Sequence, residues 1–373
     1  MTTLLRSLLL SLLVLGALPA QEDEPTRDDE DVTKEGPVDP FTKAEEKGMQ
    51  ALGVVAYGPF EWADSLRTTD LEKVLGENRI LWLETPHFRI GCNLAGVRMP
   101  SEAKARKLVG EERKRLAKKW AKIPAGGSKI SPWLRLHLYA QRCEEIYADY
   151  AQLIGHPLDA ETHLGKKHKF LVLLFQKRSD LARYLDRFCG KRSEQSQRHL
   201  HGSGHYSIVV SAERDETDDP AAVQARFRFL LVQMFTDATG TMPYWMSYGL
   251  AHWYERQVPS NIINCGIRDD EHVDPMQQHE WHKKVLARCK RDDLYIPFRD
   301  LCGLTDLGYY GHIQAWSRID YLMDLDREKL GQFVLGTNGS YSFDRQEKLL
   351  QELFGMDADT FDEKWRAWVL KKY

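Results

Sequence analysis

The chain has 373 residues, of which 42% are hydrophobic and 29% are charged. This is ordinary globular composition, and the length suffices for one large domain or two small ones. Its 52 basic and 55 acidic residues give a formal net charge of −3. No overall field therefore favours nucleic acid or an anionic membrane surface, and we expect no nucleic-acid partner.

Residues 1–20 are typical of a signal peptide. Arg6 follows a short polar start, an apolar run extends from Leu8 to Leu18, and Ala20 supplies a small residue for cleavage. The run is too short for the roughly 20 apolar residues that a membrane span needs. We therefore predict an exported protein, periplasmic or extracellular, without an integral membrane span in the mature chain. An uncleaved N-terminal anchor is the alternative.

The remaining chain divides by composition into three parts. Residues 21–45 are acidic and poor in apolar side chains, which predicts a disordered linker because little surface can be buried to offset the entropy of ordering. Residues 46–262 combine strand and helix patterns, and residues 263–373 show helical patterns. No CxxC pair occurs, so disulfides and buried free thiols both stay open for the six cysteines, which are Cys92, Cys143, Cys189, Cys265, Cys289 and Cys302.

The first strands and helices are predicted from apolar periodicity. A β-rich stretch at 80–90 is interrupted by Pro86, which predicts two short strands or an edge. A helix follows over 134–154, and the continuous apolar run of Phe170–Phe175 predicts a buried central strand. A Gly-rich turn then leads into a further strand that ends near Val210.

Two helices come next and form the centre of the predicted fold. Apolar residues at helical spacing predict a core helix, and these residues are Phe227, Leu230, Leu231, Met234, Phe235 and Ala238. Gly240 ends this helix, and Met242–Glu255 forms the second. Beyond Asn261 the sequence predicts helices alone, over 281–289, 313–325, 346–354 and 361–370.

The order of these pieces resembles the peptidase-MA-like gluzincin domain of secreted bacterial proteins, over roughly residues 80–373. The resemblance rests on Thr85–Ile90, Phe170–Phe175, Met242–Ala251, Tyr295–Leu301, Gln314–Ser317, and Phe354-Gly-Met-Asp with Trp365 eleven residues after that Phe. It implies an α+β fold in which a mixed sheet packs on two former active-site helices, followed by an all-helical C-terminal subdomain.

The residues that would bind zinc in such an enzyme are missing. A gluzincin needs His-Glu-x-x-His on the first helix and a Glu before the Gly of the second, so that three ligands hold zinc and a Glu activates its water. The first helix, Arg226–Asp237, contains no His, and Tyr248 precedes Gly249. The resemblance therefore predicts a catalytically inactive pseudopeptidase without a cofactor, which acts in binding or scaffolding.

Five aromatic residues near the second helix are candidates for a binding groove, namely Tyr244, Trp245, Tyr248, Trp253 and Tyr254. Aromatic rings can stack on a peptide or a sugar, and the predicted partner is a peptide or protein. Aromatic residues at helical spacing also pack in cores, which is the alternative for these five.

An active zinc metallopeptidase with relocated ligands is the alternative function. Its candidate ligands are His201 and His205 near a Gly-rich turn, and His279 and His282 near a predicted helix. His201 and His205 have i, i+4 spacing, but across a turn this spacing does not place them on one helix face. His279 and His282 have i, i+3 spacing without a defined third ligand. An enzyme of different chemistry in the same groove is a third reading, although no Gly-x-Ser-x-Gly or phosphate loop supports it.

Overall fold

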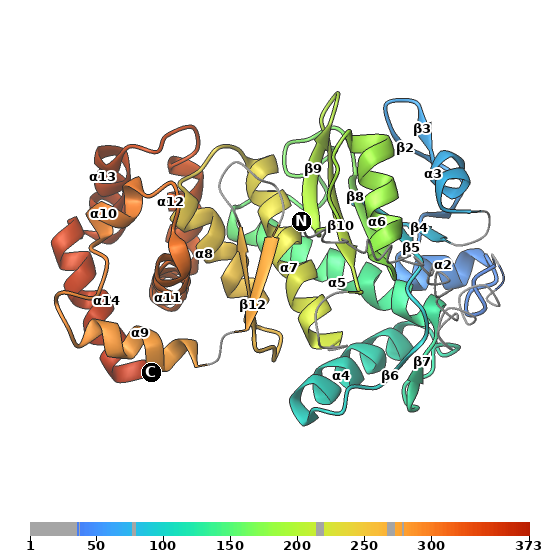
Figure 1. The fold of residues 1–373 in the computed structure, drawn as a ribbon, viewed down its shortest axis with the longest axis horizontal. Helices are drawn as coiled ribbons and strands as arrows, with labels where there is room; N and C mark the ends of the chain where they lie inside the picture. The colour runs from blue at the N-terminus through green and yellow to red at the C-terminus, as the bar shows by residue number, and fades with distance from the viewer. Residues whose placement is uncertain (1–35, 37, 77–79, 214–219, 267–272, 278–279) are drawn as a thin grey trace, which may run out of the picture.

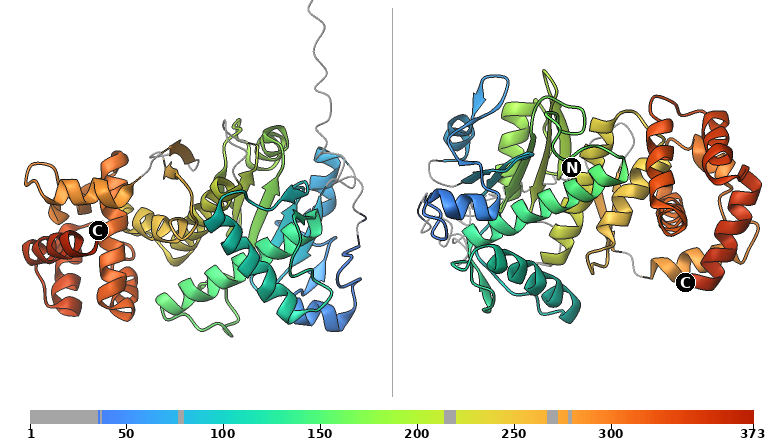
Figure 2. Two further views of the ribbon diagram at one scale, coloured as in Figure 1. Left: turned by 90° about the horizontal axis from the view of Figure 1, so that it is seen from below. Right: turned by 180° about the vertical axis from the view of Figure 1, so that it is seen from behind.

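A computed structural model describes residues 36, 38–76, 80–213, 220–266, 273–277 and 280–373. The predicted signal peptide and residues 21–35 lie outside the described residues. The predicted fold class is confirmed, because a mixed sheet and its helices are followed by a helical C-terminal region at the other end of the molecule (Figures 1 and 2).

A six-stranded mixed sheet organises the first part of the chain, in the order β1-β4-β5-β8-β10-β9. Its strands are β1 (Ala56–Tyr57), β4 (Leu81–Glu84), β5 (Phe88–Cys92), β8 (Phe170–Phe175), β9 (Gln197–His201) and β10 (His205–Ser211). Strands β5, β8 and β10 run parallel, and the other pairs are antiparallel. Three two-stranded sheets are β2 (Glu61–Ala63) with β3 (Leu66–Arg67), β6 (Val97–Arg98) with β7 (Lys129–Ile130), and β11 (Ile262–Gly266) with β12 (Val273–Gln277).

The helices before residue 260 are α2 (Glu46–Leu52), α3 (Thr68–Leu75), α4 (Ala103–Lys119), α5 (Pro132–Leu153), α6 (Arg178–Tyr184) with the π-helix η1 (Leu185–Cys189), α7 (Pro220–Thr239) and α8 (Tyr244–Glu255). Those after it are α9 (Trp281–Cys289), α10 (Phe298–Gly303), α11 (Gly308–Leu325), α12 (Arg327–Gly336), α13 (Phe343–Phe354) and α14 (Ala358–Lys372). In Figure 1, α7 and α8 lie between the sheet and this C-terminal group.

The two faces of β8 contribute to two different cores, because successive side chains of a strand point to opposite faces. Val172 and Leu174 belong to the large core that α5 and α7 form with the sheet and that continues into the C-terminal helices. Leu171 and Leu173 belong to a smaller core under α3 and α6. This double burial explains why the sequence of β8 is apolar throughout.

Helix α7 is buried along most of its length. Phe227, Leu231 and Met234 were predicted to lie in the core, and each is at most 1% exposed. That prediction is confirmed. The other faces of α7 are buried too, since β10 packs on one side and α8 on another.

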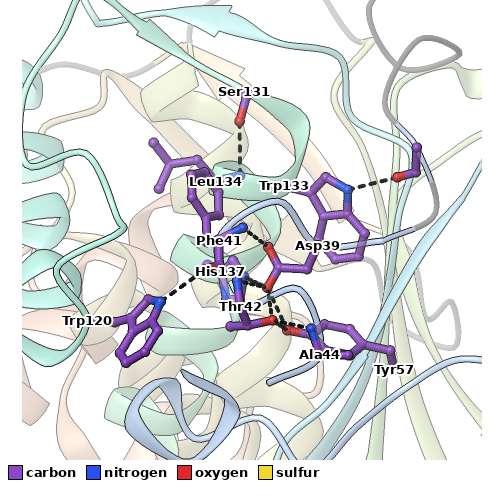
Figure 3. A network of polar contacts seen from close by, with 11 residues as sticks. Asp39, Phe41, Thr42, Ala44, Tyr57, Trp120, Ser131, Trp133, Leu134 and His137 are labelled. Atoms are coloured by element: carbon purple, nitrogen blue, oxygen red, sulfur yellow. Dashed lines mark hydrogen bonds and ion pairs between the residues drawn. The ribbon is translucent and has the colours of Figure 1, made fainter. Parts of the chain in front are cut away.

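The linker prediction for residues 21–45 is wrong over its last residues, which pack against the domain. Asp39 is buried, and its Oδ2 lies 3.1 Å from His137 Nε2 on α5. The hydroxyls of Thr42 and Tyr57 each donate to the same oxygen over 2.6 Å (Figure 3). A single buried carboxylate therefore orders a segment whose composition alone favours disorder.

Two tryptophans hold the backbone of the same segment. Trp120 Nε1 donates to the carbonyl of Phe41 over 3.0 Å, and Trp133 Nε1 donates to the carbonyl of Gly36 over 3.1 Å (Figure 3). These contacts join the segment to α4 and α5, far along the chain, and a pattern of neighbouring residues does not reveal them.

The all-helical prediction from residue 263 is also wrong at its start, where β11 and β12 form an antiparallel pair before α9. From α9 onward the described chain is helical, as predicted. None of the described helices is long and apolar enough to span a membrane. Five of the six cysteines are free thiols in the described part of the chain, namely Cys92, Cys143, Cys189, Cys289 and Cys302.

Packing accounts for the residues of the Pro-x-Trp-x-x-x-Gly-Leu-Ala motif. Pro243 is the N-cap residue of α8, and Trp245 is fully buried and donates to Gln346 Oε1 over 2.8 Å. Gly249 faces α11 so closely that a Cβ there would meet the carbonyl oxygen of Ala315 at 2.9 Å. The motif residue Gly249 therefore allows α8 and α11 to pack closely.

We predict that Asp39→Asn lowers the free energy of unfolding by about 2–3 kcal/mol at neutral pH, because it removes one charge of a buried, hydrogen-bonded pair. Burial raises the pKa of Asp39, but the hydrogen bond and charge of His137, with those of Thr42 and Tyr57, outweigh it and hold that pKa below its ordinary value. The stabilisation is therefore present above the ordinary carboxyl pKa and lost as the pH falls below about 5.

Urea unfolding at several pH values measures this difference. Glu45→Gln is the control, because Glu45 and Lys122 form an ion pair in which both side chains are about half exposed, and such pairs contribute little. A difference between wild type and Asp39→Asn that stays constant down to pH 3 would contradict the assignment.

We also predict that Gly249→Ala destabilises the protein by about 1–3 kcal/mol, since the added methyl group overpacks the α8–α11 interface. Gly110→Ala in α4 is the matched control, because a Cβ there meets nothing within 4 Å and alanine is preferred in a helix by about 0.5–1 kcal/mol. Thermal melts of both variants test the pair. Equal effects of the two substitutions would show that the close approach at Gly249 is unimportant.

Candidate functional site

A pocket of about 370 Å³ opens beside the edge strand β9, between α7 and α8. Its lining comes from β9 and β10 (Arg198, His199, Leu200, Tyr206 and Ser207), from α7 (Gln233, Met234 and Asp237), from the turn after α7 (Gly240, Thr241 and Met242), from α8 (Tyr244, Ser247 and Tyr248), and from Tyr341. Most of these side chains are polar or aromatic, which suits a ligand with both kinds of surface.

Three tyrosines form a row along one wall of the pocket. The rings of Tyr248 and Tyr244 stack with centroids 6.1 Å apart and an interplanar angle of 14°, and Tyr244 stacks on Tyr341 at 6.0 Å and 23°. Burial raises the pKa of Tyr248 and that of Tyr341. Both therefore stay neutral phenols at physiological pH, with hydroxyls that can donate to a ligand.

Arg198 crosses from β9 to α7 and holds the opposite wall. Its Nη1 donates to Gln233 Oε1 over 2.7 Å, and its Nε donates to Asp237 Oδ2. Gln233 and Asp237 are four residues apart on α7, so they lie one above the other on the same face. The only carboxylate of this helix face is thus engaged by a guanidinium, and it is poorly placed to act as a general base.

The structure brings two of the five candidate aromatic residues into the pocket. Tyr244 and Tyr248 line it, whereas Trp245 and Tyr254 are buried in the core. Trp253 is partly buried, and its Nε1 donates to Asp320 on α11. Two of the five candidates therefore line the pocket, and the other three pack between helices, which was the alternative for all five.

The structure brings only two of the candidate histidine ligands next to each other. His201 and His205 are cross-strand neighbours on β9 and β10, while His282 packs on Trp316 and Tyr373 in the C-terminal helices. His279 lies outside the described residues. Among the described residues, the one group of three such side chains close enough to hold a metal ion contains only His201 of these four, together with Cys189 and His199.

A buried chain of polar side chains lies behind the pocket and was missed in the sequence. Tyr248 contacts His312 edge to face at 4.9 Å, and His312 Nδ1 lies 2.9 Å from His252 Nε2. His252 Nδ1 in turn contacts Glu255 Oε2 at 2.5 Å, and the backbone N–H of Asn264 donates to Glu255 Oε1. The chain links α8, α11 and β11 below the tyrosine row.

Burial sets the protonation of this chain. It lowers the pKa of His252 and that of His312 well below the ordinary value, and it raises the pKa of Glu255 to about 8. At neutral pH the groups are therefore mostly uncharged, with Glu255 as the donor to His252. The i, i+3 spacing of His252 and Glu255 was visible in the sequence, but nothing there points to His312.

No family model matches the chain, and no curated protein matches it. The resemblance to the gluzincin domain therefore rests on the residues quoted for it.

We predict that Glu255→Gln leaves the free energy of unfolding almost unchanged near pH 5, because the amide reproduces the hydrogen bonds of the protonated acid. The folded-state pKa of Glu255 lies above its unfolded value, so its stabilisation is complete below the unfolded pKa and is lost as the pH rises toward 8. Between the unfolded-state pKa and pH 8, the free energy of unfolding of the wild type should fall by on the order of 1 kcal/mol per pH unit relative to that of the variant.

Denaturant unfolding at a series of pH values gives this difference directly. Glu328→Gln on the exposed side of α12 is the control, and it should change the free energy of unfolding by less than about 0.5 kcal/mol. If Glu255→Gln were strongly destabilising at pH 5, the carboxyl would have to be ionised in the folded protein.

Proposed function

We propose that the protein is an exported, catalytically inactive peptidase-like protein that binds an extended peptide segment in the pocket between β9, α7 and α8. The observation that carries the proposal is the placement of Gln233, Asp237 and Tyr248 around one pocket. These are positions where a gluzincin would carry two His and a Glu, given the i, i+4 spacing on α7 and the Gly that follows Tyr248.

The chemistry of the three side chains supports binding over catalysis. A catalytic zinc needs three protein ligands and an open position for water, whereas here a phenol, an amide and an arginine-bound carboxylate occupy the same places. The apolar residues of α7 are buried, which stabilises the helix by roughly 1.5–3 kcal/mol for each full side chain and supports packing that needs no metal.

The edge of the sheet supports a peptide as the ligand. Strand β9 is the last strand in the order of the six-stranded sheet, which is the position at which an extended peptide can add a strand. An added strand would form main-chain hydrogen bonds with β9, while pockets select alternate side chains. Tyr244, Tyr248 and Tyr341 would then receive the side chains that point toward α8.

We predict that peptides selected from a random phage-displayed library on the purified protein lose about tenfold or more in affinity for Tyr244→Ala and Tyr341→Ala, which corresponds to about 1.4 kcal/mol. Tyr310→Ala is the matched control, because Tyr310 on α11 is 47% exposed and Tyr341 is 48% exposed. Fluorescence anisotropy with labelled peptides measures the affinity, and mass spectrometry should recover the bound peptides intact.

Two outcomes would count against the proposal. Equal losses of peptide affinity in Tyr310→Ala and Tyr341→Ala would show that the binding surface lies elsewhere. Cleavage of the selected peptides that a chelator abolishes would instead favour the active peptidase with relocated ligands.

A further inference from the structure

A thiol and two imidazoles meet on the side of β9 that carries its odd-numbered residues. Cys189 is the last residue of η1, and His199 and His201 lie on β9. One ligand atom from each of the three lies within 4.8 Å of the other two. The group is independent of the two helices that line the pocket.

Local geometry explains why these three side chains meet. The period of two along a strand places His199 and His201 on one face of β9, with Arg198 on the other. Their rings contact each other edge to face at 4.4 Å. Gly190 follows Cys189 in a left-handed conformation (φ 64°), which ends the π-helix and leaves the thiol facing the strand.

The surroundings hold one of the imidazoles in a fixed orientation. Tyr184 is fully buried, and its hydroxyl lies 2.9 Å from His201 Nε2. Trp62 packs edge to face on the His201 ring at 5.3 Å. Histidine ligands in metal sites are usually oriented in this way, by a hydrogen bond at the second ring nitrogen and by a packed shell.

We propose that Cys189, His199 and His201 form a binding site for a zinc ion that fixes β9 to η1. Thiolate and imidazole are the ligands that zinc prefers, at bond lengths of about 2.0–2.3 Å. Ligands on a tetrahedral zinc then lie roughly 3.3–3.8 Å apart, so the observed group needs to contract by little more than an ångström. Cys189 and His199 are partly exposed, which gives an ion access.

The role of the metal at this site is structural. The thiol releases its proton to the solvent when the metal–sulfur bond forms, and both imidazoles bind as neutral donors. A water molecule supplies the fourth ligand. Of the four histidines considered as zinc ligands from sequence, the site uses His201 and leaves out His205, which stacks on His168.

Zinc titration of the reduced, chelator-stripped protein against a chromophoric chelator tests the site. The wild type should bind one equivalent and show a higher melting temperature with zinc, because the metal binds the folded state. Removal of an outer hydrogen-bonding partner of a metal ligand costs roughly 10- to 100-fold in metal affinity. Cys189→Ser and His201→Ala should each lose more zinc affinity than this, because each removes a ligand. Tyr184→Phe should lose affinity within that range.

Cobalt substitution identifies the sulfur ligand. The cobalt protein should show a thiolate-to-metal charge-transfer band, which disappears in Cys189→Ser and persists in Tyr184→Phe. If Cys189→Ser fails to fold, His199→Asn at the partly exposed position should keep the band and bind cobalt more weakly.

Two controls separate this site from other thiols and imidazoles. His205→Ala changes the cross-strand neighbour of His201, and Cys302→Ser removes a buried thiol of the C-terminal helices. Both should bind zinc like the wild type. Less than one equivalent bound at micromolar zinc, or an equal loss in His205→Ala, would overturn the proposal. Peptide binding itself is tested separately by the pocket variants Tyr244→Ala and Tyr341→Ala.

Discussion

The burial of α7 is the constraint on which the rest of the structure depends. A helix enclosed by the sheet, α5 and α8 must find a partner inside the protein for every polar side chain it carries, because an unpaired buried polar group costs about 1–3 kcal/mol. Gln224 donates to Glu112, and Arg226 donates to the carbonyl of Ser211. Arg228 bonds Gln257, and Gln233 accepts from Arg198. Each pair joins α7 to a different element.

Further hydrogen bonds join α7 to its neighbours. Thr236 and Ser247 share a hydrogen bond of 2.8 Å between α7 and α8, and Arg198 joins α7 to β9. The close approach at Gly249 then joins α8 to α11. Packing accounts for the motif on which the resemblance to a peptidase rests, and packing alone says nothing about catalysis.

The sequence predicted the helices, strands and core residues that depend on the pattern of neighbouring residues. The apolar run of β8 and the helical spacing on α7 report burial directly, so both elements and their core residues were found. The order of the segment at Asp39 was missed, because it depends on His137, almost a hundred residues away. The same limit applies to His252 and His312, whose contact joins two helices sixty residues apart.

The aromatic candidates illustrate the limit within one helix. Tyr244 and Tyr248 line the pocket, while Trp245, which lies between them in sequence, is buried in the core, because each residue turns the side-chain direction by about 100° around the helix axis. The sequence shows that α8 is rich in aromatic residues, but it does not show which side of the helix lines the pocket. That direction depends on where β9 and Tyr341 lie, and both come from distant parts of the chain.

Strand β9 connects the two proposed sites, since its residues alternate between them. Arg198 bonds α7 at the pocket, and His201 belongs to the thiol–imidazole group, while His199 contributes to both. An edge strand with a neighbour on one side only is held less firmly than a central strand. A metal that fixes β9 to η1 would thereby fix the strand that a peptide must pair with. Because coupling free energies are reciprocal, a peptide bound along β9 would strengthen metal binding by the same factor.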